Sequence, residues 1–382
     1  MVKKKILFII PTLDRSGAEK QLVLLATGLP RDEFEVHVAL LTRTGPLTAD
    51  LDAAGIPWTL IGKKRKISFS AYLRLKRLIR KLQPDIVHTW LFAANAYGRK
   101  AAFACRVPRV ICGERCVDPW KSPLHFLIDR QLAKKTDTIA ANSDGIRDFY
   151  VRHGLPADRF VVIPNAQPTP PPSPWSRAEL LNSLGIASQE TDAFDPSSGP
   201  FLIGIVARLW PQKRLQEALW SFDQLKFMGI DYHGIIIGDG PERDRLLRYR
   251  EELLLNDRVH FLGHRNDVSN FMPHFDLLWC TSAYEGQSNS ILEAMAAGVP
   301  VIASDIPGNR ELVVPGQTGM LIPEFDGDRQ RRRTAVTHQS FLLLRPEGYA
   351  TRKAMGIAAK ARIRDEFSLE KMIARYCELY RR

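Results

Sequence analysis

The chain has 382 residues, 45% of them hydrophobic, and a formal net charge of +12. This length predicts two or three domains, and the hydrophobic share is ordinary for a soluble globular protein. No run of about 20 apolar residues occurs, which excludes a membrane-spanning helix. The apolar start at residues 6–10 is too short for a signal peptide and predicts a first buried strand.

The cysteines show neither metal-binding nor redox spacing; they are Cys105, Cys112, Cys116, Cys280 and Cys377. An odd number of cysteines in apolar surroundings predicts reduced thiols. Reduced thiols are typical of the cytoplasm, so a cytoplasmic protein is expected.

The positive charge needs a partner or a structural reason. Nucleic acid is not expected, because no nucleic-acid-binding module is present and the basic residues are widely spread. The densest basic segment, 63–81, has nine Lys or Arg and no acidic residue, and residues 69–82 are amphipathic at helical spacing. Such a helix has two interpretations. It can rest on an anionic membrane surface, here the inner face of the membrane, or it can pack on its own sheet with a solvated outer face.

In the first half, short apolar runs alternate with helical patterns. Helices are predicted at 18–29 and 69–82. This alternation is typical of a doubly wound parallel sheet. The predicted strands lie at 6–10, 35–41, 58–61, 85–88, 109–112, 138–141 and 160–163.

The pattern breaks near Pro164 and restarts after residue 200. Residues 167–174 are proline-rich and predict a stiff linker, followed by a short helix at 176–184 and a polar stretch at 187–200. Two doubly wound sheets joined by a linker are the simplest interpretation. The second set of predicted strands lies at 201–206, 234–237, 258–262, 276–280, 299–303 and 320–322.

Two later segments stand apart from this alternation. Residues 324–349 combine an arginine run with a short apolar run, and we expect them to form a surface insertion. Residues 368–380 predict a final helix.

The segment 276–303 reads as strand, turn, helix and strand, which makes one crossover unit of a parallel sheet. Its helix, 288–297, ends at Gly298, a typical C-terminal stop. The first N–H groups of a helix attract anions, and a glycine in the turn lets a ligand approach the backbone closely. A phosphate site is therefore expected at Gly286, Gln287, Ser288 and Asn289.

Glu285 and Glu293 flank this predicted phosphate site. A carboxylate does not help to hold a phosphate, so each is expected to accept hydrogen bonds from hydroxyl groups. Phosphates in the middle and hydroxyls at both ends describe a nucleotide-sugar. Each residue also has a simpler interpretation: Glu285 as a solvated turn residue, and Glu293 as part of a helix capping box with Ser290.

Two cations and a glycine-proline pair at predicted strand ends suit the same ligand. Arg208 and Lys213 follow the strand at 201–206, and open parallel sheets bind ligands at the carboxyl ends of their strands. Arg binds phosphate oxygens bidentately, and Lys supplies a point charge. Gly240 and Pro241 follow the next strand, although a lone Gly-x-Gly is more often a plain turn.

In the first half, two residues are candidates for the site. Gly17 lies between the first strand and the first helix, where backbone N–H groups face a phosphate. His88 is expected at the carboxyl edge of its strand and is a candidate catalytic residue.

The segment 285–301 resembles the E-x7-E signature of retaining GT-B glycosyltransferases. The matching pattern is Glu-Gly-x-x-Asn-x-x-x-Glu followed by Ala-x-x-x-Gly-x-Pro-Val. Residues 238–241 resemble the family's Gly-x-Gly-Pro, and the loop after Gly263 resembles its base-binding segment. Residues 207–214 resemble its Gly-Arg-Leu…Lys-Gly segment, and Ser16-Gly17 its Gly-Gly pair. Three positions depart from the family's glycines: Ser16, Ala207 and Arg214.

This resemblance implies a role for each residue. Arg208, Lys213 and the start of the helix at Ser288 would neutralise the leaving diphosphate, and Glu293 would bind the ribose. Glu285 would bind or orient the sugar, or act as the nucleophile. Many relatives have a histidine near the reacting carbon where this chain has Arg115, which is expected to donate hydrogen bonds to sugar or acceptor instead.

The resemblance implies the α/β GT-B fold, with two Rossmann-like doubly wound parallel-sheet domains facing a central cleft. The acceptor domain is expected at 1–166, completed by a C-terminal helix at 367–382 that crosses back onto it. The linker and loop are expected at 167–200, and the nucleotide-sugar donor domain at 201–366.

The implied function is retaining transfer of a sugar from a nucleotide diphosphate sugar to a hydroxyl acceptor. A glycan or lipid-linked glycan in cell-surface polysaccharide, lipopolysaccharide or glycolipid synthesis is expected. No cofactor or metal is expected, because two cations do the neutralising. The alternatives are a nucleotide-sugar epimerase of the same fold, which needs no acceptor, and a non-enzymatic basic binding protein. An NAD dehydrogenase is disfavoured, because no Gly-x-Gly-x-x-Gly follows the first strand.

Overall fold

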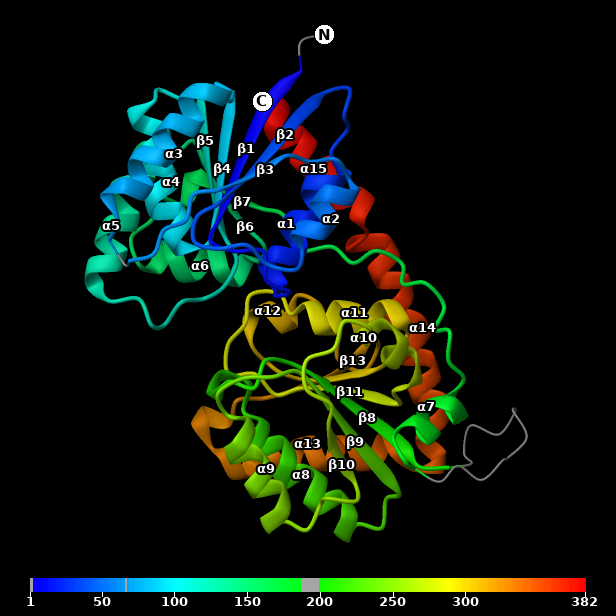
Figure 1. Ribbon diagram of the computed structural model, residues 1–382. Helices are drawn as coiled ribbons and strands as arrows, with labels where there is room; N and C mark the ends of the chain where they lie inside the picture. The colour runs from blue at the N-terminus through cyan, green and yellow to red at the C-terminus, as the bar shows by residue number, and fades with distance from the viewer. Residues whose placement is uncertain (1–2, 66, 187–198) are drawn as a thin grey trace. The chain divides into compact units, whose positions relative to one another are not determined.

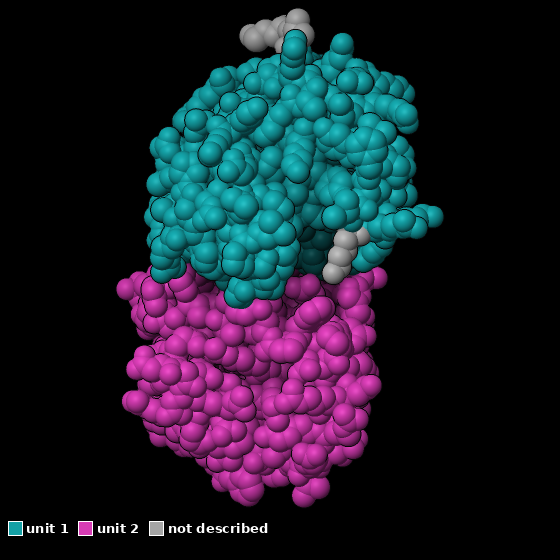
Figure 2. Space-filling view, turned by 90° about the vertical axis from the view of Figure 1, so that its left-hand side faces the viewer, with its two compact units in different colours: residues 1–166, 369–382 teal, residues 167–368 magenta. Residues whose placement is uncertain are grey.

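The computed structural model describes residues 3–65, 67–186 and 199–382 (Figure 1). The chain divides into two compact units, residues 1–166 with 369–382 (unit 1) and residues 167–368 (unit 2) (Figure 2). Each unit contains one parallel sheet with helices on both faces. The prediction of an α/β fold with two doubly wound parallel sheets is confirmed.

The sheet of unit 1 has seven parallel strands in the order β3-β2-β1-β4-β5-β6-β7. The central strand β1 pairs Ile6 with Val36 on one side and with Ile86 on the other. It is buried on both faces, which explains its continuous apolar run. All seven predicted strands are confirmed. Their bounds are β1 Lys4–Ile10, β2 Phe34–Leu40, β3 Trp58–Leu60, β4 Ile86–Trp90, β5 Arg109–Glu114, β6 Thr138–Ala141 and β7 Phe160–Val162.

Helices cover both faces of this sheet. Phe8 and Ile10 of β1 pack in one core with α1, α2 and α15, whereas Leu7 and Ile9 pack in another with α3 and α4. The C-terminal helix α15 therefore completes unit 1. The helices of unit 1 are α1 Gly17–Gly28, α2 Thr48–Ala53, α3 Phe69–Leu82, α4 Phe92–Ala104, α5 Pro123–Ala133, α6 Asp144–Arg152, the 3-10 turn η1 Ala157–Arg159, and α15 Leu369–Arg381.

The basic helix α3 packs on its own sheet. Ala71, Leu75 and Ile79 are buried in the core shared with β1 and α4, while Arg74, Arg77 and Arg80 are exposed. The buried apolar side of α3 is thus used for packing, whereas its charged side and Phe69 at its start face solvent.

The sheet of unit 2 has six parallel strands in the order β10-β9-β8-β11-β12-β13. The six strands predicted for this half are confirmed. Their bounds are β8 Phe201–Val206, β9 Tyr232–Ile237, β10 Val259–Phe261, β11 Leu277–Cys280, β12 Val301–Ser304 and β13 Gly319–Ile322.

One face of this sheet packs against α11 and α14, and the other against α8 and α13. The short helix predicted at 176–184 is α7, whereas most of the polar stretch at 187–200 lies outside the described residues. The helices of unit 2 are α7 Arg177–Ser183, η2 Pro211–Lys213, α8 Leu215–Phe227, α9 Arg243–Glu252, α10 Val268–Phe271, η3 Met272–His274, α11 Asn289–Ala297, α12 Pro307–Arg310, η4 Phe325–Gly327, α13 Arg329–Leu344, η5 Pro346–Gly348 and α14 Tyr349–Glu366.

The expectation of a surface insertion at 324–349 is wrong. Most of this segment is α13, whose Val336, Leu343 and Leu344 are buried in the core that includes β8 and α8. Arg332 forms an ion pair with Glu217 of α8 at 2.9 Å. The arginine run concealed the helix because its charges face solvent or pair with α8, so the apolar positions looked isolated in the sequence.

None of the helices in the described part of the chain is long and apolar enough to cross a membrane.

Candidate functional site

The carboxyl ends of β8 and β11 mark a ligand-binding position in unit 2. The strand order reverses between these two strands, and open parallel sheets bind ligands outside the carboxyl ends at such a switch point. The loop after β8 carries Arg208 and Lys213, and the loop after β11 carries Glu285 and the start of α11. The structure therefore brings two of the predicted motifs to one edge of the sheet.

Hydrogen bonds join these two loops directly. The Gln212 side-chain amide donates to the carbonyl of Tyr284 at 2.6 Å, and the Ala283 N–H donates to the carbonyl of Gln212 at 2.8 Å. The Thr281 hydroxyl donates to the carbonyl of Lys213 at 2.8 Å. The cationic loop and the glutamate turn are thus one connected structure.

Lys213 and Glu285 form an ion pair at the centre of this structure. Ser282 Oγ also donates to Glu285 Oε1, at 2.7 Å. Burial acts to lower the pKa of Lys213, but the Glu285 carboxylate more than offsets this effect, so the pKa lies above its ordinary value. Glu285 is therefore not the freely solvated turn residue of the simpler interpretation.

The two other basic residues of the loop differ in exposure. Arg208 is exposed, and its guanidinium lies 5.6 Å from the ring centre of Trp210. Arg214, where the resemblance implies a glycine, has a left-handed backbone with φ of 51°, a conformation that favours glycine. Its side chain pairs with Glu324 at 2.8 Å. The substitution thus keeps the glycine-like turn at the start of α8.

The loop after β9 packs against the same cationic loop. A Cβ atom on Gly238 would lie 1.9 Å from the carbonyl oxygen of Ala207, and one on Gly240 would lie 2.5 Å from that of Leu209. The Leu209 N–H donates to the carbonyl of Asp239 at 2.9 Å. Only glycines allow the two loops to approach so closely. The loop that carries Gly240 and Pro241 therefore packs against the backbone on both sides of Arg208.

The phosphate site predicted at 286–289 lies at the start of α11. The N-cap of α11 is Ser288, whose side chain makes no capping hydrogen bond to the helix, and Gly298 ends the helix with φ of 81°. Ser290 lies inside the first turn, so the capping box proposed for Ser290 and Glu293 is absent. The Gln287 amide donates to Glu311 Oε2 at 3.4 Å.

In unit 1, Gly17 is the first residue of α1, immediately after the N-cap Ser16. Glu19 lies beneath this loop, is 5% exposed, and accepts hydrogen bonds from Ser16 and Thr12. Burial raises the pKa of Glu19, although the hydrogen bond from Ser16 acts against the shift. Glu19 therefore holds the loop before Gly17, and the sequence analysis did not identify it.

The expectation that His88 lies at the carboxyl edge of its strand is wrong, because β4 continues to Trp90. His88 is fully buried, and its Nδ1 lies 2.7 Å from the hydroxyl of Tyr380 in α15. Burial and the nearby Arg115 hold the pKa of His88 well below its ordinary value. His88 therefore takes part in the packing of α15 on the sheet, and its catalytic role stays a prediction.

Arg115 is also buried. Its guanidinium donates to the Tyr376 hydroxyl at 3.2 Å and to Asn165 Oδ1 at 3.1 Å, and it stacks 4.1 Å from the ring centre of Trp90. Asn142 donates to the same oxygen of Asn165 at 3.2 Å. In this structure Arg115 links β5 to α15, and the hydrogen bonds predicted for it to sugar or acceptor stay a prediction.

Comparison with known families identifies both halves. Residues 15–169 match the model described as Glycosyltransferase Family 4, and residues 188–335 match Glycosyl transferases group 1. The two matches follow one another along the chain and together span most of both units. The chain belongs to the GT-B glycosyltransferases of the family 4 type.

Individual relatives agree with this family. The chain is 32% identical to N-acetyl-alpha-D-glucosaminyl L-malate synthase of Bacillus anthracis over 168 residues, which is 44% of this chain and 42% of the relative. It is 27% identical to UDP-Gal:alpha-D-GlcNAc-diphosphoundecaprenol alpha-1,3-galactosyltransferase of Escherichia coli, over 78% of this chain and 79% of the relative. The Anabaena Alr3699/HepE structure with UDP-glucose has a TM-score of 0.84 and 24% identity, covering 98% of this chain and 99% of that chain.

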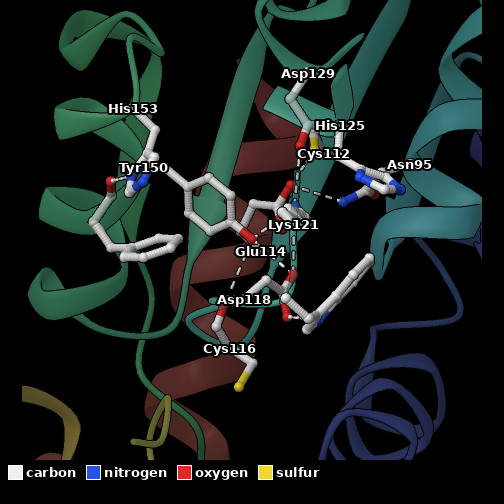
Figure 3. A network of polar contacts seen from close by, with 12 residues as sticks. Asn95, Cys112, Glu114, Cys116, Asp118, Lys121, His125, Asp129, Tyr150 and His153 are labelled. Atoms are coloured by element: carbon white, nitrogen blue, oxygen red, sulfur yellow. Dashed lines mark hydrogen bonds and ion pairs between the residues drawn. The ribbon is translucent and has the colours of Figure 1, made fainter. Parts of the chain in front are cut away.

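Unit 1 of this glycosyltransferase holds a buried charge network that the sequence analysis did not identify (Figure 3). The side chain of Lys121 is fully buried, donates to Asp129 at 3.0 Å and to the Tyr150 hydroxyl at 2.8 Å, and pairs with Asp118 at 3.3 Å. Asp129 also pairs with the fully buried Arg99 at 2.8 Å. The network ties the loop after β5 to α4, α5 and α6.

Glu114, the last residue of β5, is a further buried carboxyl group of this network. It accepts a hydrogen bond from Asn95 at 3.1 Å and lies 3.8 Å from Lys121 Nζ. Burial raises the pKa of Glu114 to about 7, although Lys121 acts to lower it. Near neutral pH this carboxyl is therefore partly protonated.

Stability is expected to depend on pH through Glu114. The pKa of Glu114 rises from 4.5 to about 7 on folding. Between these two pH values the folded state therefore retains a proton that the unfolded state releases. This contribution is complete below the unfolded pKa and is lost as pH rises through about 7, at a cost of up to about 3 kcal/mol. Urea denaturation measures the free energy of unfolding at about pH 5 and about pH 8. The decrease between these two pH values should be smaller in Glu114→Gln than in the wild type.

The exposed Glu35→Gln, also in unit 1, is the control. It should keep the wild-type pH dependence. An unchanged pH dependence in Glu114→Gln would contradict the assignment.

Proposed function

We propose that this glycosyltransferase moves a sugar from a nucleotide diphosphate sugar to a hydroxyl group, with retention of configuration at the anomeric carbon and without a metal ion. The observation that supports this most is the joining of Lys213, Glu285 and the start of α11 at the switch point of the unit 2 sheet. Cations and a helix N-terminus suit a diphosphate, and a carboxylate beside them suits sugar hydroxyls.

The printed names of relatives support the same donor and acceptor classes. The E. coli relative uses UDP-Gal and a diphosphoundecaprenol-linked GlcNAc, and a Mycobacterium tuberculosis relative is a GDP-mannose-dependent alpha-mannosyltransferase. We propose a glycan or lipid-linked glycan as the acceptor here, and a location at the inner face of the membrane.

In the proposed reaction the bond from the anomeric carbon to the donor diphosphate breaks, and a bond to the acceptor oxygen forms. The diphosphate leaves with the electron pair of the broken bond and takes up the proton that the acceptor hydroxyl loses. The negative charge that develops on the leaving group is stabilised by Arg208, Lys213 and the start of α11. Each hydrogen-bonding group of this kind contributes about 3–4 kcal/mol.

Lys213 would exchange partners when the donor binds. Its ammonium group is paired with Glu285 in this structure, and a diphosphate would attract it more strongly because it carries more charge. Glu285 would then accept hydrogen bonds from sugar hydroxyls, while Glu293 binds the ribose. Arg208, already exposed, would close on the diphosphate from the same loop.

A thermal-shift screen with UDP, GDP, ADP and their sugar conjugates tests the donor site. At least one nucleotide diphosphate should raise the melting temperature, and Arg208→Ala should lose most of that rise together with turnover. Arg331→Ala, exposed in the same unit, is the control and should keep it. No rise with any of these nucleotides, or normal donor affinity and turnover in Arg208→Ala, would falsify the donor site.

Product analysis tests the reaction class. NMR of the product should show that the transferred sugar has the same anomeric configuration as in the nucleotide-sugar donor. Activity should also persist in EDTA. An inverted product or loss of activity in EDTA overturns that part of the proposal. Conversion of the donor without acceptor would identify an epimerase instead.

A further inference from the structure

Large apolar side chains are exposed at the starts of two helices of unit 1. Trp120 is 58% exposed, Leu124 63% and Leu127 45%, all in or just before α5. Ile67 and Phe69, at the start of α3, are 86% and 72% exposed. Exposed apolar residues are common singly, but groups of them mark interaction sites.

The first turns of α4 connect these two groups. Phe92 of α4 lies 5.7 Å from the ring centre of Trp120. Five residues along the helix, the Tyr97 hydroxyl accepts a hydrogen bond from the Ser68 N–H at 2.8 Å, and Lys63 Nζ lies 5.2 Å from the Tyr97 ring. Five residues of helix span only about 7.5 Å. The two apolar groups therefore flank one short stretch of α4, with α3, α4 and α5 side by side (Figure 1).

The fold itself forces Trp120 outward. The next residue, Lys121, is buried in the charge network, whereas Trp120 faces solvent. This arrangement reverses the usual one, in which the lysine is outside and the tryptophan inside. The Trp120 indole donates to Asp118 Oδ1 at 3.1 Å, and Asp118 also pairs with Lys121. The exposed ring is thus anchored by buried ionic contacts.

Basic residues border the apolar groups. Lys63, Lys64 and Arg65 come shortly before Ile67 in the chain, and the outer face of α3 adds Arg74 and Arg77. Residues 63–81 contain no acidic residue. Near an anionic membrane each such cation contributes about 1 kcal/mol, and Trp and Leu prefer the interfacial region.

We propose that unit 1 docks on an anionic lipid bilayer through one surface, the docking face: Lys63, Lys64, Arg65, Ile67, Phe69, Trp120, Leu124 and Leu127. The apolar residues enter the interface, and the cations contact the headgroups. This extends the expected membrane contact of 63–81 to the start of α5, which the sequence did not indicate. Its purpose rests on the proposed function, since docking brings the enzyme to a lipid-linked acceptor.

Flotation of the protein with vesicles of phosphatidylcholine, with or without phosphatidylglycerol, tests the docking face. The wild type should float with phosphatidylglycerol vesicles, and less so at high salt. Leu124→Gln/Leu127→Gln should weaken this binding by about tenfold or more. Lys63→Gln/Lys64→Gln/Arg65→Gln should remove the preference for anionic lipid. Ile357→Gln, 64% exposed in unit 2, is the control and should float normally.

Absence of flotation of the wild type at low salt overturns the proposal. A loss of vesicle binding in Ile357→Gln as large as that in Leu124→Gln/Leu127→Gln also overturns it. A change of oligomeric state in the Leu124/Leu127 variant, without a change in vesicle binding, assigns the face to a second copy and also overturns it. The nucleotide thermal shift should be unchanged in every variant. Failure of docking is therefore distinguishable from failure of the donor site.

Discussion

Lys213→Ala is expected to lower kcat by about 100- to 1,000-fold, the usual effect of removing one preorganised donor to developing charge. Lys213 lies in the loop after β8 and is paired with Glu285 in the loop after β11. Its loss removes a cation from the leaving diphosphate. It also leaves a largely buried Glu285 without its cationic partner, which opposes the binding of an anionic donor.

Two further variants separate these effects. Lys213→Arg keeps the positive charge and should retain more activity than Lys213→Ala. Lys213→Ala/Glu285→Gln removes the uncompensated carboxylate, so donor affinity should partly recover while kcat stays low. Lys353→Ala, exposed in the same unit, is the matched control. Wild-type kcat and donor affinity in Lys213→Ala would contradict the placement of the diphosphate beside this loop.

Asp129→Ala is expected to lower the free energy of unfolding by about 3–5 kcal/mol, because removal of one partner leaves buried charges uncompensated. Asp129 accepts from Lys121 at 3.0 Å and from Arg99 at 2.8 Å, and all three side chains are fully buried. Urea denaturation measures the loss, and if the two units unfold separately only the transition of unit 1 should move.

Asp144→Ala is the matched control for this prediction. Asp144 forms an ion pair with Arg147 on the surface of α6, and its side chain is 56% exposed. Exposed pairs contribute about 0–1 kcal/mol, so its loss should be small. Equal effects of the two substitutions would show that the buried network does not stabilise unit 1.

Much of the fold could be predicted because its signals are local. The strands of both parallel sheets are short apolar runs buried on both faces, and their alternation with helical patterns indicates the crossover connections. Gly298 ends α11 with a left-handed backbone, as its position predicted. Parallel topology also fixes which strand ends share an edge, so Lys213 and Glu285 could be expected together before their contact was visible.

Contacts between distant segments are what the sequence pattern does not report. The tyrosines of α15, far along the chain, contact His88 and Arg115, and the roles predicted for these two residues near a ligand stay predictions. The arginines of α13 concealed a core helix. Strand ends were recognised from composition, but composition does not report which distant segment packs over a strand.

The amino-acid sequence alone determined the order of elements, the two parallel sheets and the loops that carry Arg208, Lys213 and Glu285, because these depend on short-range patterns and on the geometry of parallel strands. The tertiary structure decided the burial of His88, the pairing of Lys121 with three carboxylates and the outward position of Trp120. Each of these results from contacts between segments distant in sequence, where burial outweighs the preference of a side chain for water or for the core.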